Sequence, residues 1–238
     1  MISTNNPGRV AGFLYLLLVV FAPFRLIYIP SVLYVRGNAT ATANNIAAHE
    51  TLFRFGIAGD LFTGTMVIFV ALAFYRLFKG VDQNQAVLMV ILGGVLPSAI
   101  YFFNVLNDAA ALMLARGADF LSVFEKPQRD ALAMLFLRLH HQEVVAAEIF
   151  WGLWLFPLGV LAYRSRFLPR FLGVWLIING FAYLIMSFTG LFAPQYEDMV
   201  SNLAFPAQLG EPALMLWLVV KGARPHPLDA PTVSPAVG

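Results

Sequence analysis

Six long apolar stretches constrain the fold of this chain more than any other feature. They cover residues 10–35, 52–78, 86–114, 144–163, 171–192 and 203–220. The hydrocarbon core of a bilayer is about 30 Å thick, and a helix crosses it with about 20 apolar residues. Because unpaired backbone groups are costly in lipid, such stretches must be helical. The sequence therefore predicts an all-α fold, a polytopic membrane protein built as a bundle of six transmembrane helices.

The composition excludes both a water-soluble globular domain and a disordered chain. Of the 238 residues, 60% are hydrophobic and 12% are charged, whereas soluble domains carry about 25% charged residues. The absence of cysteine excludes disulfides, thiolate metal ligands and a cysteine nucleophile. The 15 basic residues are scattered singly, so nucleic-acid binding has no support. The lipid bilayer is therefore the expected partner.

Two regions are expected, a six-span transmembrane domain over residues 1–221 and a disordered cytoplasmic tail over residues 222–238. The tail has no apolar period, as is typical of segments that form no core. Its prolines are Pro225, Pro227, Pro231 and Pro235. At the other end, the apolar run after Arg9 continues past Phe24 without a small-residue cleavage site, which predicts a retained first span rather than a signal peptide.

Basic residues in the loops predict that both termini face the cytoplasm. Six crossings bring both ends to one side, and the loops of that side carry eight bases: Arg9, Arg76, Lys79, Arg164, Arg166, Arg170, Lys221 and Arg224. The opposite side carries four: Arg36, Arg116, Lys126 and Arg129. Because Lys and Arg accumulate in cytoplasmic loops, the first set indicates the inner side.

The segment before the fourth stretch is unusually long for a loop. Pro127 suits the first position of a helix, and no helix breaker follows before Pro157. A continuous helix over residues 128–163 would be about 54 Å long, which exceeds the membrane thickness. Residues 131–139 are therefore expected to form either an amphipathic surface helix or an extension above the membrane.

Polar side chains within the apolar stretches are the candidate functional residues, because each of them costs free energy in lipid. Most of them fall in the outer half of the membrane, where we expect one shared polar cavity. The predicted ligand-binding residues are Arg54, Asp60, Asn104, Asp108, Arg138, His141, Glu148 and Glu211. The arginines would hold an anionic headgroup or substrate, and the carboxylates and histidine would hold a cation or handle protons.

Helical spacing and charge sharpen this expectation. Asn104 and Asp108 are four residues apart, and His141 and Glu148 are seven apart, so each pair shares a helix face. The positive side chains at this level are Arg25, Arg54 and Arg138, and the negative ones are Asp60, Asp108, Glu143, Glu148 and Glu211. Three positive and five negative charges leave a formal remainder of −2. Protonation or a bound cation would relieve it.

Two alternatives to a binding cavity remain open. The first is a metal-dependent intramembrane hydrolase, in which His141 and Glu148, with Asp108 or His140, would hold a metal that activates water. No HExxH motif supports it, so no metal site or cofactor is assigned. The second is a structural or accessory membrane subunit, in which the same polar groups hold helices together.

Several segments resemble a known family. They are RVAG at residues 9–12, RFGIAGD at 54–60, LRLHHQ at 137–142, IFWGLWLFPLG at 149–159 and YRSRFLPRFLG at 163–173. The chain thereby resembles a bacterial family of six-span membrane proteins, the domain of unknown function 4386, over nearly its whole length short of the tail. The resemblance implies a multi-pass protein of the bacterial inner membrane, and it implies no activity and no catalytic residue.

Overall fold

A computed structural model describes residues 6–224, with all side chains in that range except those of Val20 and Ala22. Over this range the chain contains no strand, and six helices are long and apolar enough to cross a membrane. They span Pro7–Leu33, Glu50–Phe78, Gln83–Arg116, Lys126–Arg164, Arg170–Phe192 and Pro194–Val220. The predicted all-α, six-span fold is confirmed. Most of the predicted proline-rich tail, from residue 225 onward, lies outside the described residues.

The first span changes its winding between Pro23 and Pro30. It consists of α1 (Pro7–Pro23), a π-helical turn (Phe24–Tyr28) and α2 (Ile29–Leu33). The Ile29 amide donates to the carbonyl of Phe24, five residues back. Because the ring of Pro30 excludes a normal helical hydrogen bond at its own position, the wider turn keeps the chain helical. Such turns are frequent at functional sites.

The third span also contains a π-helical turn close to a proline. It joins α5 (Gln83–Val90) to α6 (Leu96–Arg116) through a second π-helical turn, Ile91–Val95, which ends two residues before Pro97. Here the Leu96 amide donates to the carbonyl of Ile91. The turn keeps α5 and α6 within one crossing despite the proline.

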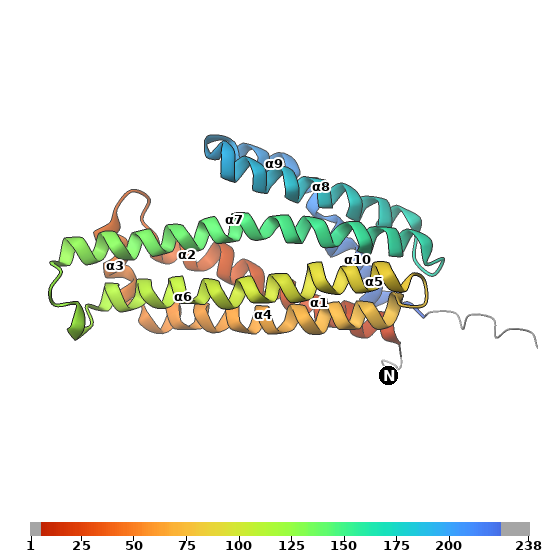
Figure 1. Cartoon of the computed structure of the whole chain (residues 1–238), viewed down its shortest axis with the longest axis horizontal. Helices are drawn as coiled ribbons and strands as arrows, with labels where there is room; N and C mark the ends of the chain where they lie inside the picture. Colours follow the sequence, from red (N-terminus) through yellow and green to blue (C-terminus); the bar gives the residue numbers. More distant parts are fainter. Residues whose placement is uncertain (1–5, 225–238) are drawn as a thin grey trace, which may run out of the picture.

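A short helix that the hydropathy pattern does not predict lies between the first two spans. This helix, α3 (Ala39–Ala48), starts at Asn38, whose side chain accepts a hydrogen bond of 2.9 Å from the Ala41 amide. It lies at the end of the bundle away from the described termini (Figure 1). Its Ile46 is fully buried against α2, α4 (Glu50–Phe78), α6 and α7 (Lys126–Arg164).

The fourth span is one continuous helix, α7 (Lys126–Arg164), of 39 residues. At 1.5 Å per residue it is about 58 Å long. A reciprocal capping box between Glu125 and Gln128 fixes its start. Residues 131–139 are part of this continuous helix rather than a separate surface helix, and Leu137 packs into the same cluster as Ile46.

The last two spans are α8 (Arg170–Phe192) and a broken crossing that returns beside it. The broken crossing comprises a 3-10 turn (Pro194–Tyr196), α9 (Glu197–Gln208) and α10 (Gly210–Val220). The Trp175 indole donates to the carbonyl of Pro206 at 3.2 Å, which ties α8 to the end of α9.

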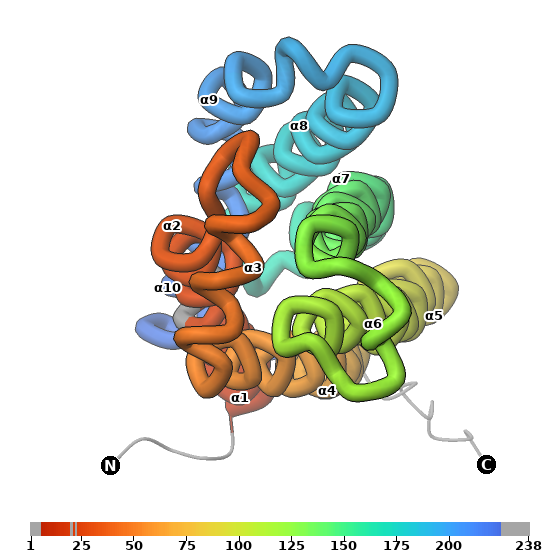
Figure 2. Tube along the Cα trace, turned by 90° about the vertical axis from the view of Figure 1, so that its left-hand side faces the viewer, coloured from red at the N-terminus to blue at the C-terminus, as the bar shows by residue number. Residues whose placement is uncertain are grey.

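The six spans form a ring in sequence order, which the contact of α10 with α1 closes at the terminal end. Each span packs against the next, and α10 packs against α1; Figure 2 shows this ring along its axis. The closure is tight, because the Gly8 amide donates to the carbonyl of Ala223 at 3.1 Å. Both ends of the described chain therefore lie at one end of the bundle, as an even number of spans requires.

Two apolar clusters divide the inside of this ring. A large one at the terminal end contains Tyr15, Phe74 and Trp154, and a smaller one at the opposite end contains Leu33 and Phe53. Polar side chains of α4, α6, α7 and the first π-helical turn lie between them along the sequence of each helix. This polar layer is the candidate functional region.

Candidate functional site

Four buried polar side chains from four different elements meet between the two apolar clusters. Arg25 comes from the first π-helical turn, Asp60 from α4, Asp108 from α6 and His140 from α7; their exposed fractions are 8%, 5%, 1% and 8%. Arg25 Nε donates to Asp60 Oδ2 at 2.8 Å, and Arg25 Nη2 donates to Asp108 Oδ2 at 2.6 Å. We call this group the arginine quartet.

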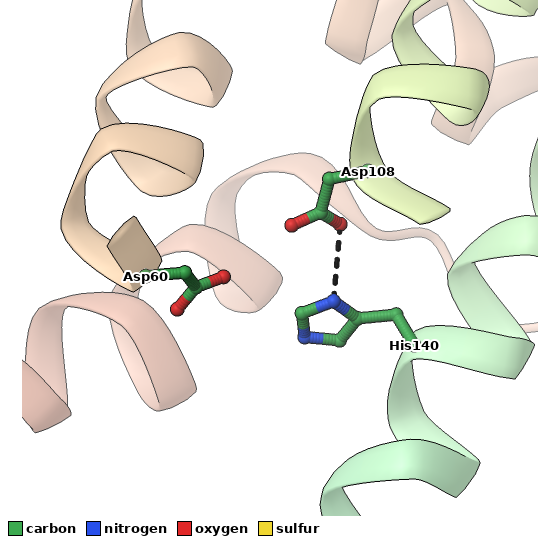
Figure 3. Close-up of side chains that lie close together, drawn as sticks. All are labelled: Asp60, Asp108 and His140. Atoms are coloured by element: carbon green, nitrogen blue, oxygen red, sulfur yellow. Dashed lines mark ion pairs between the residues drawn. The ribbon is translucent and has the colours of Figure 1, made fainter. Parts of the chain in front are cut away.

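The imidazole of His140 contacts two members of the quartet in different ways. Its Nδ1 lies 3.2 Å from Asp108 Oδ1 (Figure 3). Arg25 Nη2 lies 3.3 Å from Nδ1 and 3.0 Å from Nε2 of the same ring. Since the two ring nitrogens point in different directions, an atom this close to both lies over the ring face. Arg25 Nη2 therefore lies over the imidazole face, while Asp108 approaches the edge of the ring.

Amide side chains extend the polar layer between α6 and α7. Asn104 Nδ2 donates to the main-chain carbonyl of His140 at 3.2 Å. Asn107 Nδ2 donates to Asn104 Oδ1 at 3.1 Å and to Glu143 Oε2 at 3.0 Å. These contacts fix the rotation of α6 against α7 and so hold Asp108 opposite His140.

Part of the quartet has the composition of a metal site. One ligand atom each from Asp60, Asp108 and His140 lie within 4.8 Å of one another, and three such ligands with an open position suit a catalytic zinc ion. However, the guanidinium of Arg25 lies among these atoms and already neutralises one carboxylate charge. A metal would have to displace Arg25, so the residues fit an internal ion-pair network better than a metal centre.

A cleft of about 570 Å³ opens beside the quartet, between the end of the first span and α7. Its polar lining is almost entirely basic or aromatic: Arg25, Tyr34, Arg36, Arg138, His140 and His141, with Ser31 as the remaining polar side chain. No carboxylate is among its lining residues. Apolar side chains such as Leu26 and Met134 form the rest of the wall. We call this the basic cleft.

The structure distributes the eight residues predicted from the sequence over several places. Asp60 and Asp108 belong to the quartet, Asn104 supports it, and Arg138 and His141 line the basic cleft. His141 Nε2 also lies 3.2 Å from Glu197 Oε1 of α9.

The other three predicted residues lie away from the cleft lining. Arg54 Nε lies 2.7 Å from Glu50 Oε1 on an exposed part of α4. Glu148 is partly buried on α7. Glu211 lies at the start of α10 and lines a separate pocket of about 190 Å³. The eight residues therefore do not line one shared cavity.

Arg25 and His140 are central to the site but absent from the residues predicted to bind a ligand. Arg25 is the only charged side chain in residues 10–35, which is a usable signal because a lone charge in a span needs a partner. The sequence gives no comparable indication that His140 belongs to the site. It precedes His141 directly, and only the rotation of α7 decides which of the two faces inward.

Comparison with known proteins adds family membership. The family described as "Domain of unknown function (DUF4386)" matches residues 10–222. The chain belongs to this family. The match covers all four members of the arginine quartet and all six spans, and the resemblance seen in the sequence is confirmed.

One relative is similar over most of its length. It is described as "Uncharacterized protein", comes from Archaeoglobus fulgidus, and is 25% identical over 177 residues, which is 71% of this chain and 85% of the relative. No solved structure matches the chain. The DUF4386 assignment therefore brings no activity, and the membrane setting follows from the six long apolar helices.

Proposed function

We propose that this DUF4386 protein binds an amphiphile with an anionic headgroup in the basic cleft, in the outer half of the bacterial inner membrane. The observation that carries the proposal is the lining of the cleft, which combines three arginines and two histidines with apolar side chains and includes no carboxylate. Guanidinium groups match phosphate and carboxylate oxygens in pairs. The apolar wall suits the adjoining acyl chain.

The three arginines have different freedom to bind. Asp60 and Asp108 hold the guanidinium of Arg25 in place, whereas Arg36 and Arg138 are exposed. Neither Arg36 nor Arg138 has an ion-pair partner in the part of the chain that the structure describes. Their charges are therefore available to an anion at the mouth of the cleft.

The depth of the cleft follows from the first span. Arg25 lies 18 residues beyond Pro7, which is about 27 Å along a helix. With both termini in the cytoplasm, as the loop charges favour, the cleft lies at the level of the outer leaflet. A headgroup at this height needs no deep burial, since it stays near the interface.

The two alternatives gain less from this geometry. A hydrolase built on His141 and Glu148 would need a third metal ligand. His141, however, lies on the cleft side, toward Glu197. The group of Asp60, Asp108 and His140 already contains the guanidinium of Arg25. The quartet alone suits a structural role, because it joins helices. Ligand binding therefore depends on the basic cleft rather than on the quartet.

The test is a ligand titration of the purified protein in an uncharged detergent. Lysophosphatidylglycerol should raise the midpoint of thermal unfolding progressively with concentration, as a ligand of the folded state does. Inorganic phosphate and an uncharged monoacylglycerol of the same chain length separate the headgroup from the chain. An equal shift with the monoacylglycerol would overturn the proposal, and a shift with phosphate alone would identify a free anion as the ligand.

Matched variants place the ligand in the cleft. Arg138→Gln should weaken binding of lysophosphatidylglycerol about tenfold, because it removes a charged hydrogen bond. Arg116→Gln is the control, since Arg116 is equally exposed but pairs with Glu50 outside the cleft. Equal affinities of the two variants would place the ligand elsewhere.

A further inference from the structure

We propose a second binding site, for a small organic ammonium ion, in the pocket that contains Glu211. The pocket has a volume of about 190 Å³ and lies inside the ring of helices, where all six spans contribute to its lining. Five aromatic side chains and one carboxylate dominate it: Tyr15, Tyr101, Trp151, Trp154, Tyr183 and Glu211. It shares only Leu26 with the basic cleft, so this proposal does not rest on the one above.

The carboxylate of Glu211 has neutral partners only. The Tyr15 hydroxyl donates to Oε2, the Asn179 amide donates to Oε1 at 3.0 Å, and Tyr183 also contacts the carboxylate. No Lys, Arg or His forms an ion pair with Glu211 within residues 6–224. An ionised Glu211 therefore lacks a counter-ion from these residues, and the interior of a membrane protein makes an unpaired charge costly.

The aromatic walls suit a cation without strong hydration. Trp151 and Tyr183 pack edge to face with ring centroids 6.0 Å apart, and Tyr15 and Trp154 do so at 5.8 Å. Rings arranged at steep angles present both faces and edges around one space, and ring faces attract cations. Walls of this kind are the usual recognition mode for quaternary ammonium groups.

Size and donor set favour an organic ion over a metal ion. Calcium is bound mainly by carboxylate, carbonyl and water oxygens, whereas this pocket offers one carboxylate, Glu211, and its other side-chain oxygens are the hydroxyls of Thr63 and three tyrosines. The volume of about 190 Å³ is below the roughly 300–1,000 Å³ of pockets for drug-sized ligands. A methylated or primary ammonium group of a few heavy atoms matches both limits.

Gly93 and Trp154 show how the pocket keeps its shape. A Cβ at position 93 would lie 2.5 Å from the Trp154 ring, so the second π-helical turn can approach this wall only because residue 93 is glycine. The wall is therefore built by a specific close approach rather than left as a packing gap.

The experiment compares choline with its uncharged isostere 3,3-dimethyl-1-butanol, using the purified full chain at constant ionic strength and about pH 8. We expect choline to quench tryptophan fluorescence saturably and to raise the unfolding midpoint. The isostere should bind at least tenfold more weakly, because it lacks the charge that pairs with Glu211. Equal binding of the two compounds, or no binding of choline, would overturn the proposal.

Variants then identify the pocket. Glu211→Gln keeps the shape and much of the hydrogen bonding but removes the charge, so choline affinity should fall about tenfold or more. Asp198→Asn, at an exposed carboxylate on α9, is the control and should bind choline as the wild type does. If Glu211→Gln fails to fold, Trp151→Leu tests the aromatic wall instead and should also weaken choline binding. Unchanged choline affinity in the folded variant would contradict the site.

Discussion

Arg25 illustrates how one side chain can organise a membrane protein. Its guanidinium joins a carboxylate of α4 to one of α6 and contacts an imidazole of α7 through Nη2. The charge of a lone arginine in lipid would be strongly unfavourable, and so would two neighbouring carboxylates without it. Each group is thus tolerated because the others are present, which couples the packing of four spans at a single point.

Removal of this arginine should be strongly destabilising. Arg25→Met leaves Asp60 and Asp108 buried without a counter-ion, and breaking a buried ion pair in this way costs about 3–5 kcal/mol. The measurement is the free energy of unfolding in mixed detergent, with Arg116→Gln as an exposed comparison expected to cost less than about 1 kcal/mol.

Neutralising the two carboxylates tests whether their unpaired charges cause this loss of stability. The triple variant Arg25→Met, Asp60→Asn, Asp108→Asn should recover part of the lost stability, because no unpaired charge remains. An Arg25→Met protein that unfolds like the wild type would show that the quartet does not stabilise the ring.

At the scale of elements, α7 and α8 approach each other through two reciprocal glycine pairs. A Cβ on Gly152 would lie 2.7 Å from the carbonyl oxygen of Gly180, and one on Gly159 would lie 2.7 Å from that of Gly173. The partners are seven residues apart on each helix, about two turns. Small residues at such positions let helix backbones pack closely in lipid, where van der Waals contact replaces the hydrophobic effect between helices.

Filling one of these contacts should separate the two helices. In Gly173→Ala the new Cβ would lie 2.6 Å from the Gly159 oxygen and 2.7 Å from the Tyr163 nitrogen, so we expect a loss of about 1–3 kcal/mol in unfolding free energy. Gly59→Ala is the control, since nothing lies within 4 Å of its added Cβ and alanine favours helices. The interpretation fails if both variants have the same stability.

At the scale of the whole molecule, the ring places both described ends of the chain together. The α1–α10 contact that closes it, with the Gly8 to Ala223 hydrogen bond, joins the first and last spans. Polar groups can collect inside such a ring, because the outer faces of its helices meet lipid. The orientation of the ring in the membrane then decides which compartment the basic cleft serves.

Labelling can establish this orientation, because the chain has no cysteine of its own. In intact bacterial cells, a single Ser122→Cys in the loop before α7 should react with a membrane-impermeant maleimide. Gly80→Cys, in the loop before α5, should react only after permeabilisation. The reverse pattern would place both termini outside and move the basic cleft to the cytoplasmic side.

The sequence by itself determined the number and the helical nature of the spans, but the structure begins the fourth and sixth spans earlier than the apolar stretches do, at Lys126 and Pro194. A helix needs about 20 apolar residues to cross the bilayer, and its backbone groups must be hydrogen-bonded within it. Long apolar stretches in the sequence therefore predict helical crossings. The unpredicted α3 lacks this signal, since small and polar residues fill most of it. The sequence also predicted the family, from the segments around residues 137–173.

Only the tertiary structure decided which polar groups meet. Successive residues of an α-helix point about 100° apart, so His140 enters the quartet while its neighbour His141 faces the basic cleft and Glu197. The depth of a residue follows from its position in the span, but its direction depends on how each helix is rotated against its neighbours. For the same reason Glu211 occupies a pocket of its own, because closure of the ring turns α10 toward Tyr15 and Asn179.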